Sequence, residues 1–403
     1  MTCIRPMRTT PGLALDRTCT LRLHPPAFTP ARTSAKRQTM SRAVKEAPEQ
    51  QNLAFATVDD GVWEEKYADQ YGTLDFGASS AQGPRESMED CAYVIPRARC
   101  GFLFAAVFDG HSGFAAAQYL SEQLYDSFSD AIDEGSYGPE CSIDERESGG
   151  ICCPVELRSL LTDSFRETDE KLLSWLQSSA AEDEKNAGAT ATIALARRDK
   201  IVVANVGDSR AVLSRRGQAV DLTTEHRVTG SGPTVEAEVH RVESVGGWIE
   251  DGRVCDVIAV SRAFGDAQFK GDGPKDMLQQ GVSEEWWDQK FADSKQITGN
   301  LLEATPDVVE APVQEDDEFL ILATDGLWDV VTSHDAVTMA RSDFKKRRSA
   351  QDIADRLTKV ALQRRTEDNV SVVVVDLGGG KEGWSKPKQK NSERWKGVLG
   401  IGD

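Results

Sequence analysis

Carboxylates stand at the ends of the apolar segments of this sequence. Asp109, Asp266 and Asp325 each end such a segment, and Asp368 comes just before another. An unpaired carboxylate at the end of a buried strand is costly to remove from water. No matching number of Arg or Lys residues adjoins these acids, so the pattern indicates that bound cations supply the neutralising charge.

The types of ligand narrow the choice of cation. The chain has only five His residues, and oxygen ligands favour Mg²⁺ or Mn²⁺ over zinc. Two such ions about 3.5–4 Å apart commonly catalyse phosphoester hydrolysis, because they activate water and hold the phosphoryl oxygens. The sequence therefore predicts a phosphoester hydrolase with two Mg²⁺ or Mn²⁺ ions per active site.

The charge is unevenly distributed along the 403 residues, whose net charge is −19. Residues 1–45 hold nine basic residues and one acid, which leaves 38 basic against 65 acidic residues in the remainder. Such an acidic body lacks the basic face that binds a phosphate backbone, so a nucleic-acid-binding protein is excluded. The basic, Ser- and Thr-rich N-terminus is typical of a chloroplast or mitochondrial transit peptide.

Cysteine spacing and hydropathy exclude two further classes of protein. The eight cysteines contain no C-x-x-C pair, which favours free thiols, and the adjacent Cys152 and Cys153 carry no recognisable metal-site spacing. No apolar run approaches the roughly 18–20 residues that span a bilayer, so a transmembrane protein is not expected.

Strands and helices alternate in a way that predicts an α+β domain at 70–378, with two sheets packed together and covered by helices. We expect a linker at 46–69, a surface insertion at 133–155, a polar flap at 268–304 and a basic flexible tail at 379–403. The expected strands are 101–108, 190–196, 201–206, 210–214, 219–222, 318–323 and 370–375, and the expected helices are 114–132, 157–176, 235–245, 334–345 and 350–364.

Six short motifs occur in a fixed order over about residues 70–378. They are Arg85-Glu-Ser-Met-Glu-Asp90, Phe108-Asp-Gly-His-Ser-Gly113, Val206-Gly-Asp-Ser-Arg210, Ser261-Arg-Ala-Phe-Gly-Asp266, Ala323-Thr-Asp-Gly-Leu-Trp-Asp329 and Thr366-Glu-Asp-Asn369. Together they resemble the metal-dependent type 2C protein Ser/Thr phosphatases. The resemblance implies a four-layer α-β-β-α sandwich of two antiparallel sheets.

The same resemblance assigns the metal ligands. It implies that Asp109 bridges both ions, that the carbonyl of Gly110 binds one, and that Asp266 and Asp368 complete the other. Glu89 and Asp90 would act directly or through bound waters.

The resemblance also assigns the catalytic groups. Arg85 would bind the substrate phosphate, since a guanidinium can pair with two of its oxygens. His111 would protonate the departing Ser or Thr oxygen. Asp109, which would bridge both ions, is also assigned as catalytic. The metal-bridged hydroxide would attack phosphorus directly, so no protein nucleophile is required.

Other polar residues are given structural roles. Asp208 and Asp325 are assigned to turn formation and strand-end capping, and Asp163 and Asp169 to the solvated face of a helix. His226 and His240 are also predicted to be structural. Some relatives bind a third metal through an acid at the position of Lys185, and the lysine here puts such a site in doubt.

Four stretches outside the motifs resemble a chloroplast thylakoid-associated branch of the family: 168–176, 242–249, 252–255 and 276–281. This implies that the substrates are phosphorylated light-harvesting complex II antenna proteins, dephosphorylated by a monomer in the stroma or at the thylakoid surface. The tail has six basic residues and two tryptophans, which suit either a solubilising segment or contact with an anionic membrane.

Alternatives remain at this point. They are a plastid phosphatase for photosystem II core or soluble phosphoproteins, a mitochondrial member of the family, and a non-catalytic phosphoprotein-binding scaffold.

Overall fold

The computed structural model describes residues 72–133 and 156–378. The predicted transit peptide, linker and tail, together with all of the predicted insertion except Asp133, lie outside the described residues. Among the described residues, no helix has both the length and the apolar character needed to cross a membrane.

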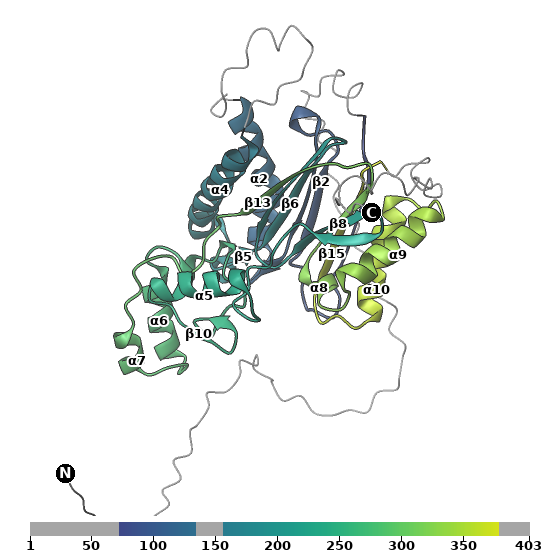
Figure 1. Cartoon of the computed structure of the whole chain (residues 1–403). Coiled ribbons are helices and arrows are strands. Elements are labelled where there is room, and N and C mark those ends of the chain that lie inside the picture. Colours follow the sequence, from purple (N-terminus) through teal and green to yellow (C-terminus); the bar gives the residue numbers. More distant parts are fainter. Residues whose placement is uncertain (1–71, 134–155, 379–403) are drawn as a thin grey trace, which may run out of the picture.

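Two five-stranded antiparallel sheets form the centre of the molecule (Figure 1). The first sheet has the order β1 (Asp75–Ala81), β15 (Val370–Asp376), β14 (Asp317–Ala323), β8 (Arg210–Arg215) and β9 (Gln218–Asp221). The second has the order β13 (Asp307–Pro312), β7 (Lys200–Val206), β6 (Ala191–Ala196), β3 (Leu103–Phe108) and β2 (Cys91–Ile95).

Both faces of these sheets are covered, which explains the uninterrupted apolar strands in the sequence. Successive side chains of a strand point to opposite faces. In β3, Leu103, Ala105 and Val107 belong to the core between the sheets. Phe104 and Phe108 belong instead to the core under the outer helices. A strand covered on both sides therefore needs no polar alternation.

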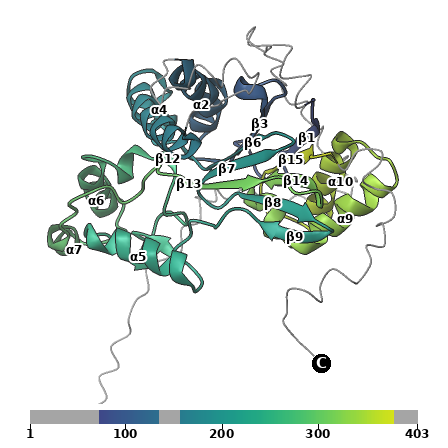
Figure 2. The ribbon, with the colours of Figure 1, turned by 45° about the horizontal axis from the view of Figure 1, so that its top comes forward.

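Helices form the two outer layers (Figure 2). On the second sheet lie α2 (Ala115–Asp133) and α4 (Leu157–Ser179). On the first sheet lie α8 (Asp325–Trp328), α9 (Ser333–Lys345) and α10 (Ala350–Gln363). This arrangement is the predicted α-β-β-α sandwich.

A small three-stranded sheet joins parts of the chain that are distant in sequence. Its order is β12 (Phe264–Gly265), β5 (Gly188–Ala189) and β4 (Gly110–His111). The pairing places His111 opposite Gly188, and Gly188 opposite Gly265. Two of the predicted catalytic motifs thus meet across β5.

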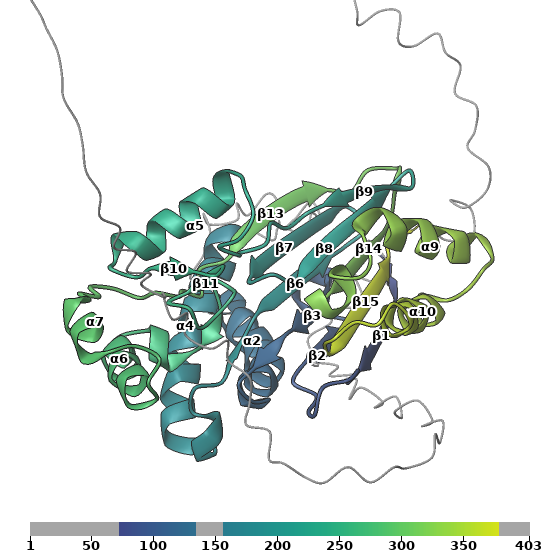
Figure 3. The ribbon, with the colours of Figure 1, turned by 90° about the horizontal axis from the view of Figure 1, so that it is seen from below.

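The segment 268–304 is not the loop-like flap that its polar sequence predicts. It contains η3 (Ala267–Phe269), α6 (Gly273–Ser283) and α7 (Gln289–Ser294). These pack with α5 (Pro233–Ser244), β10 (Ile249–Glu250) and β11 (Arg253–Val254) around their own apolar core. We call residues 228–302 the helical lobe, which lies beside the sandwich in Figure 3.

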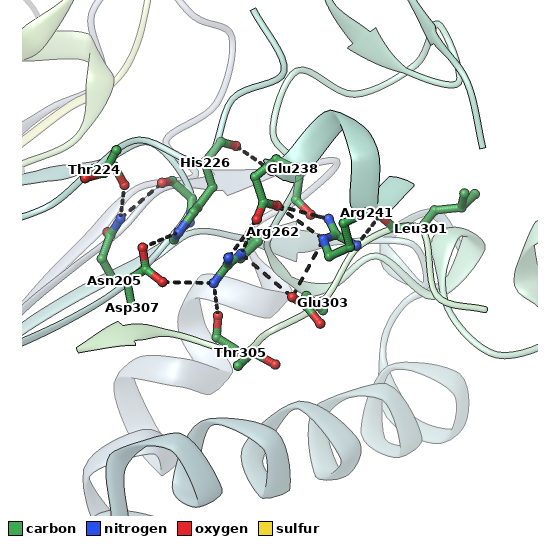
Figure 4. Close-up of polar contacts among 12 residues, drawn as sticks. Asn205, Thr224, His226, Glu238, Arg241, Arg262, Leu301, Glu303, Thr305 and Asp307 are labelled. Atoms are coloured by element: carbon green, nitrogen blue, oxygen red, sulfur yellow. Dashed lines mark hydrogen bonds and ion pairs between the residues drawn. The ribbon is translucent and has the colours of Figure 1, made fainter. Parts of the chain in front are cut away.

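A partly buried ionic network connects the helical lobe to the second sheet (Figure 4). The guanidinium of Arg262 donates to Glu238 of α5 at 2.6 Å and to Asp307 of β13 at 3.2 Å. Burial alone would raise the pKa of Glu238, but hydrogen bonds from Arg262 and Ser261 and the nearby positive charges lower it to about 2. The carboxylate is therefore ionised at neutral pH and pairs with Arg262 and Arg241, which hold the helical lobe in place.

The remaining 3₁₀ helices are η1 (Arg99–Gly101), before β3, and η2 (Glu182–Glu184), after α4. Every helix predicted from the sequence is present within a few residues of its expected bounds. The strands β1, β2 and β13 were not predicted, because β2 is short and β1 and β13 mix polar with apolar residues.

Edge strand β1 offers a test of the packing, because α10 lies directly against it. The side chain of Gln351 donates to the carbonyl of Ala78 at 2.7 Å and accepts from its N–H at 3.2 Å. A Cβ added at Gly77 would overlap the backbone of Gln351. We expect Gly77→Ala to lower the free energy of unfolding by about 1–3 kcal/mol in a urea titration, because backbone cannot yield as a side chain can.

Gly299→Ala is the matched control, since its added Cβ would meet only the side chain of Val245, with a nearest atom at 3.0 Å. Equal destabilisation by the two substitutions would contradict the close approach of α10 to β1.

Candidate metal centre

Three carboxylates meet at one end of the sandwich. Asp109 follows β3, Asp208 follows β7, and Asp325 begins α8 directly after β14. One oxygen from each lies within 4.8 Å of the others. Both sheets contribute, because β3 and β7 belong to the second sheet and β14 to the first.

These carboxylates are poorly compensated by the protein alone. Burial, and then the charges of Asp90, Asp325 and Asp208, raise the pKa of Asp109 well above its ordinary value. Burial and the charge of Asp208 raise the pKa of Asp325 to about 8. An all-oxygen donor set with this excess of negative charge fits hard divalent cations.

Arg227 is the cation that the chain itself supplies to this cluster. Its Nε lies 2.7 Å from Asp208 Oδ2, and its Nη2 lies 2.9 Å from Asp325 Oδ2. Even so, the pKa of Asp325 stays raised, because the charge of Arg227 lowers it less than burial and the other carboxylates raise it. The single guanidinium of Arg227 therefore neutralises only part of the negative charge of the carboxylate cluster.

Asp90 lies behind this cluster and is 5% exposed. Its Oδ2 accepts a hydrogen bond from Thr324 Oγ1 at 2.8 Å. Burial is the main cause that raises the pKa of Asp90, to about 7, and the charge of Asp368 adds to it. The Asp90 side chain therefore belongs electrostatically to the carboxylate cluster, as its predicted role requires.

The loop that carries Arg85 is fixed by Asn369. The Asn369 amide donates to the carbonyls of Gln82 and Ser87 at 2.7 and 3.0 Å, and its Oδ1 accepts from the N–H of Glu89 at 2.7 Å. These hydrogen bonds hold the motif 85–90 next to the motif 366–369. Nothing in the sequence analysis assigned a role to Asn369.

Arg85 lies at the rim of the site. Its Nη2 pairs with Asp368 Oδ2 at 2.5 Å, and its Nε donates to the carbonyl of Glu367 at 3.0 Å. The Arg85 side chain is 55% exposed, which leaves it accessible to an anionic substrate. Position and charge suit the predicted binding of a phosphoryl group.

Gly110 and Glu89 lie against each other at the start of β4. A Cβ at Gly110 would overlap the carbonyl oxygen of Glu89, so the approach of these two segments requires glycine. Glu89 Oε1 accepts from Ser87 Oγ at 2.6 Å. The backbone of Glu89 therefore lies against the residue that follows Asp109, and the metal-ligand roles of Gly110 and Glu89 stay predictions.

His111 pairs with Asp266 rather than standing alone. Its Nε2 lies 2.8 Å from Asp266 Oδ2, and Asp266 is 1% exposed. Burial lowers the pKa of His111, but the charge and hydrogen bond of Asp266 outweigh it, so the pKa is raised overall. A Cβ at Gly188 would occupy the place where these side chains meet.

The structure adds two aspartates to the candidate metal ligands. Asp208 and Asp325 were assigned to turns, yet they are the residues that join Asp109 in the described carboxylate cluster. Asp266 was predicted to ligate a metal, and that role stays a prediction, since the structure instead places it against His111. The useful signal was present in the sequence: Asp325 follows an apolar strand just as Asp109 does.

The position linked to a third metal is occupied by a lysine that is already paired. Lys185 Nζ lies 2.7 Å from Glu182 Oε2. The neighbouring Glu184 accepts from the N–H of Phe114 at 3.0 Å.

His226, predicted to be structural, is fully buried and accepts from the N–H of Gly207 through Nδ1, which holds the turn before Asp208.

Comparison with solved structures supports the fold. The chain is similar to a serine-threonine phosphatase 2C from Toxoplasma gondii, with a TM-score of 0.56 and 21% identity over 76% of this chain and 95% of that one. It is also similar to a C. elegans sex determining protein, with a TM-score of 0.55 and 22% identity over 75% and 65% of the two chains.

Comparison with sequences is more specific. Protein phosphatase 2C 57 of Arabidopsis thaliana is 41% identical over 303 residues, which cover 75% of this chain and 75% of that protein. A rice protein described as a probable protein phosphatase 2C 68 is 32% identical over 75% of this chain and 78% of its own. The sequence model of the family described as protein phosphatase 2C matches residues 74–370. The chain therefore belongs to the protein phosphatase 2C family and is a metal-dependent protein serine/threonine phosphatase.

Proposed function

We propose that this phosphatase uses two divalent cations, Mg²⁺ or Mn²⁺, held at the end of the sandwich where the partly buried carboxylates of Asp109, Asp208 and Asp325 converge. That convergence is the observation that carries the proposal. When bound, the cations supply water activation and neutralise charge on the phosphoryl group. The residues that would hold them are Asp109, the Gly110 carbonyl, Asp325 and Asp368, with Glu89, Asp90 and Asp208 in support and Asp266 as the further predicted ligand.

The chain's own groups orient the substrate. Arg85 binds the phosphoryl oxygens from the rim, where its contact with Asp368 aligns the guanidinium. His111 gives its proton to the departing Ser or Thr oxygen, which is a poor leaving group as an alkoxide. Asp266 stabilises the protonated imidazole from the buried side.

Metal binding should stabilise the fold, and more so at higher pH. The raised pKa values of Asp90, about 7, and Asp325, about 8, mean that the metal-free fold favours protonated carboxyls. Their contribution to stability is complete below the unfolded pKa near 4 and is lost as pH rises through 7–8. At a concentration 100 times the dissociation constant at pH 8, Mg²⁺ should raise the melting temperature by about 5–10 °C at that pH. The same Mg²⁺ concentration should raise it by less at pH 5.

Asp325→Asn should raise the melting temperature of the metal-free protein at pH 8 and abolish most of the shift caused by Mg²⁺. Asp335→Asn is the control, because Asp335 pairs with Arg364 on the surface. A shift of equal size in wild type and Asp325→Asn would exclude Asp325 from the metal site.

We propose further that the substrates are phosphorylated light-harvesting complex II antenna proteins in chloroplasts. Four stretches, 168–176, 242–249, 252–255 and 276–281, support this through their resemblance to the thylakoid-associated branch. The basic, acid-poor N-terminus independently suits a plastid address. A stromal or peripheral thylakoid location of a monomer follows from the same proposal.

Phosphorylated thylakoid membranes test the substrate directly. Incubation with the full chain and Mg²⁺ should remove phosphothreonine from antenna proteins faster than from photosystem II core proteins, as followed by immunoblotting, and EDTA should stop the reaction. Faster loss from the core proteins would favour the alternative substrate. Release of phosphate from an aryl phosphate, but from neither antenna nor core proteins, would be consistent with phosphatase activity and would refute the antenna proposal.

A further inference from the structure

A buried ion pair joins α4 to the segment that follows Asp266. Lys270 Nζ lies 2.7 Å from Asp169 Oδ2 and donates to the carbonyl of Ala263 at 2.8 Å. Asp169 and Lys270 are 8% and 6% exposed. The prediction that Asp169 is solvated was wrong, because α4 turns this residue toward β12 and the helical lobe.

The second oxygen of Asp169 holds the turn that carries Asp266. Asp169 Oδ1 accepts from the backbone N–H of Gly265 at 2.8 Å. Gly265 and Asp266 have φ values of +70° and +54°. Left-handed backbone is unfavourable for a residue with a Cβ, so Asp266 keeps this conformation only if its surroundings fix it. The Asp266 N–H also donates to the carbonyl of Ala187 at 3.1 Å.

The turn determines where the Asp266 carboxylate lies relative to His111. β12 and β4 both pair with β5, so Gly265 and His111 lie on either side of Gly188. Asp266 Oδ2 reaches His111 Nε2 across Gly188, where no Cβ intervenes. Displacement of the Gly265 amide would move this carboxylate away from the imidazole.

We propose that Asp169 is a positioning residue for catalysis: its hydrogen bond to Gly265 fixes the Asp266 turn, and Asp266 in turn orients His111 toward the leaving oxygen. This inference rests on the proposed role of His111 as the proton donor. Asp169 itself touches neither substrate nor metal ligand set; it acts through the backbone of Gly265.

The simpler interpretation is that the pair only attaches α4 to the helical lobe. Asp169 and Lys270 line one wall of a hollow of about 740 Å³ between α4 and α6. A buried ion pair can often be replaced by apolar side chains of similar size without loss of stability. Stability alone therefore does not explain why a carboxylate accepts from Gly265 at this place, and the two interpretations predict different kinetics.

Two double variants separate the interpretations. Asp169→Leu/Lys270→Met removes both charges and the acceptor for the Gly265 N–H, while it keeps the site filled. Asp169→Asn/Lys270→Met also removes both charges but retains an acceptor oxygen. Asp163→Asn is the matched control on the exposed side of the same helix, where Asp163 is 45% exposed. Each variant is assayed as the full chain with saturating Mg²⁺ on a phosphoserine peptide and on 4-nitrophenyl phosphate.

The two substrates differ in their need for a proton donor, because 4-nitrophenolate leaves readily without protonation. We expect Asp169→Leu/Lys270→Met to lower kcat on the phosphopeptide by about 10-fold or more, with KM unchanged and less than about 3-fold loss on the aryl phosphate. Asp169→Asn/Lys270→Met and Asp163→Asn should stay within about 3-fold of wild type on both. Gly188→Ala, which separates His111 from Asp266 directly, should reproduce the selective loss.

Equal losses on the two substrates with an unchanged Mg²⁺ requirement, or equal behaviour of the two double variants, would overturn the positioning role while leaving the phosphatase proposal intact. Wild-type protein inactive on both substrates would instead refute the proposed function, and this inference with it. If the Leu/Met variant does not fold, as judged by its melting temperature, the unbranched Asp169→Met/Lys270→Met variant is used with the same expected outcomes.

Discussion

The mutual repulsion of partly buried carboxylates is the constraint on which the rest of this structure depends. Asp109, Asp208 and Asp325 have oxygens within 4.8 Å of one another, and Arg227 compensates only part of their charge. Like charges held this close in a partly buried site oppose folding unless protons or cations neutralise them. The carboxylate cluster therefore requires protons or cations to neutralise it, and the proposed chemistry depends on cations in that role.

The sandwich supplies the rigidity that holds these charges together. Strands of both sheets end at the same place, and their apolar residues pack into three layers, of which Phe104, Leu103 and Val374 are examples. The free energy of burying these layers outweighs the local repulsion. Backbone rather than side chains fixes the acids, because each directly follows a strand or begins a short helix. A shift of the ligands would thus require a shift of the core.

Much of the fold could be predicted from the sequence because its periodicities are strong. The run 101–108 has the pattern of a strand covered on both faces, and 114–132 and 350–364 have the pattern of amphipathic helices. The four-layer sandwich itself was implied by the resemblance to the family. β1 and β13 were missed because their stability depends on partners distant in sequence, such as β15 and β7. The polar segment 268–304 was misinterpreted as a loop because half of its core comes from residues 228–263.

The site was predictable only in part, for a related reason. Local motifs identify Asp109, Arg85 and His111, but whether an acid after a strand ends in a turn or in a shared cluster depends on how the sheets stack. Asp325 was therefore assigned to a turn rather than to the carboxylate cluster, and no role was predicted for Arg227 or Asn369. Asp169 was wrongly assigned to the solvated face of its helix. The packing of Phe165 against Phe264 turns the Phe165 and Asp169 side of α4 toward β12, while Asp163 stays exposed.

Equilibrium dialysis of the full chain against Mn²⁺ at pH 8, with the bound metal counted per chain, tests most directly whether the carboxylate cluster is a metal centre. We expect two ions per chain for wild type and the loss of at least one in Asp109→Asn, with the fold retained by circular dichroism. Wild-type protein that binds no Mn²⁺, or an Asp109→Asn variant that binds as much as wild type, would contradict the proposed metal centre.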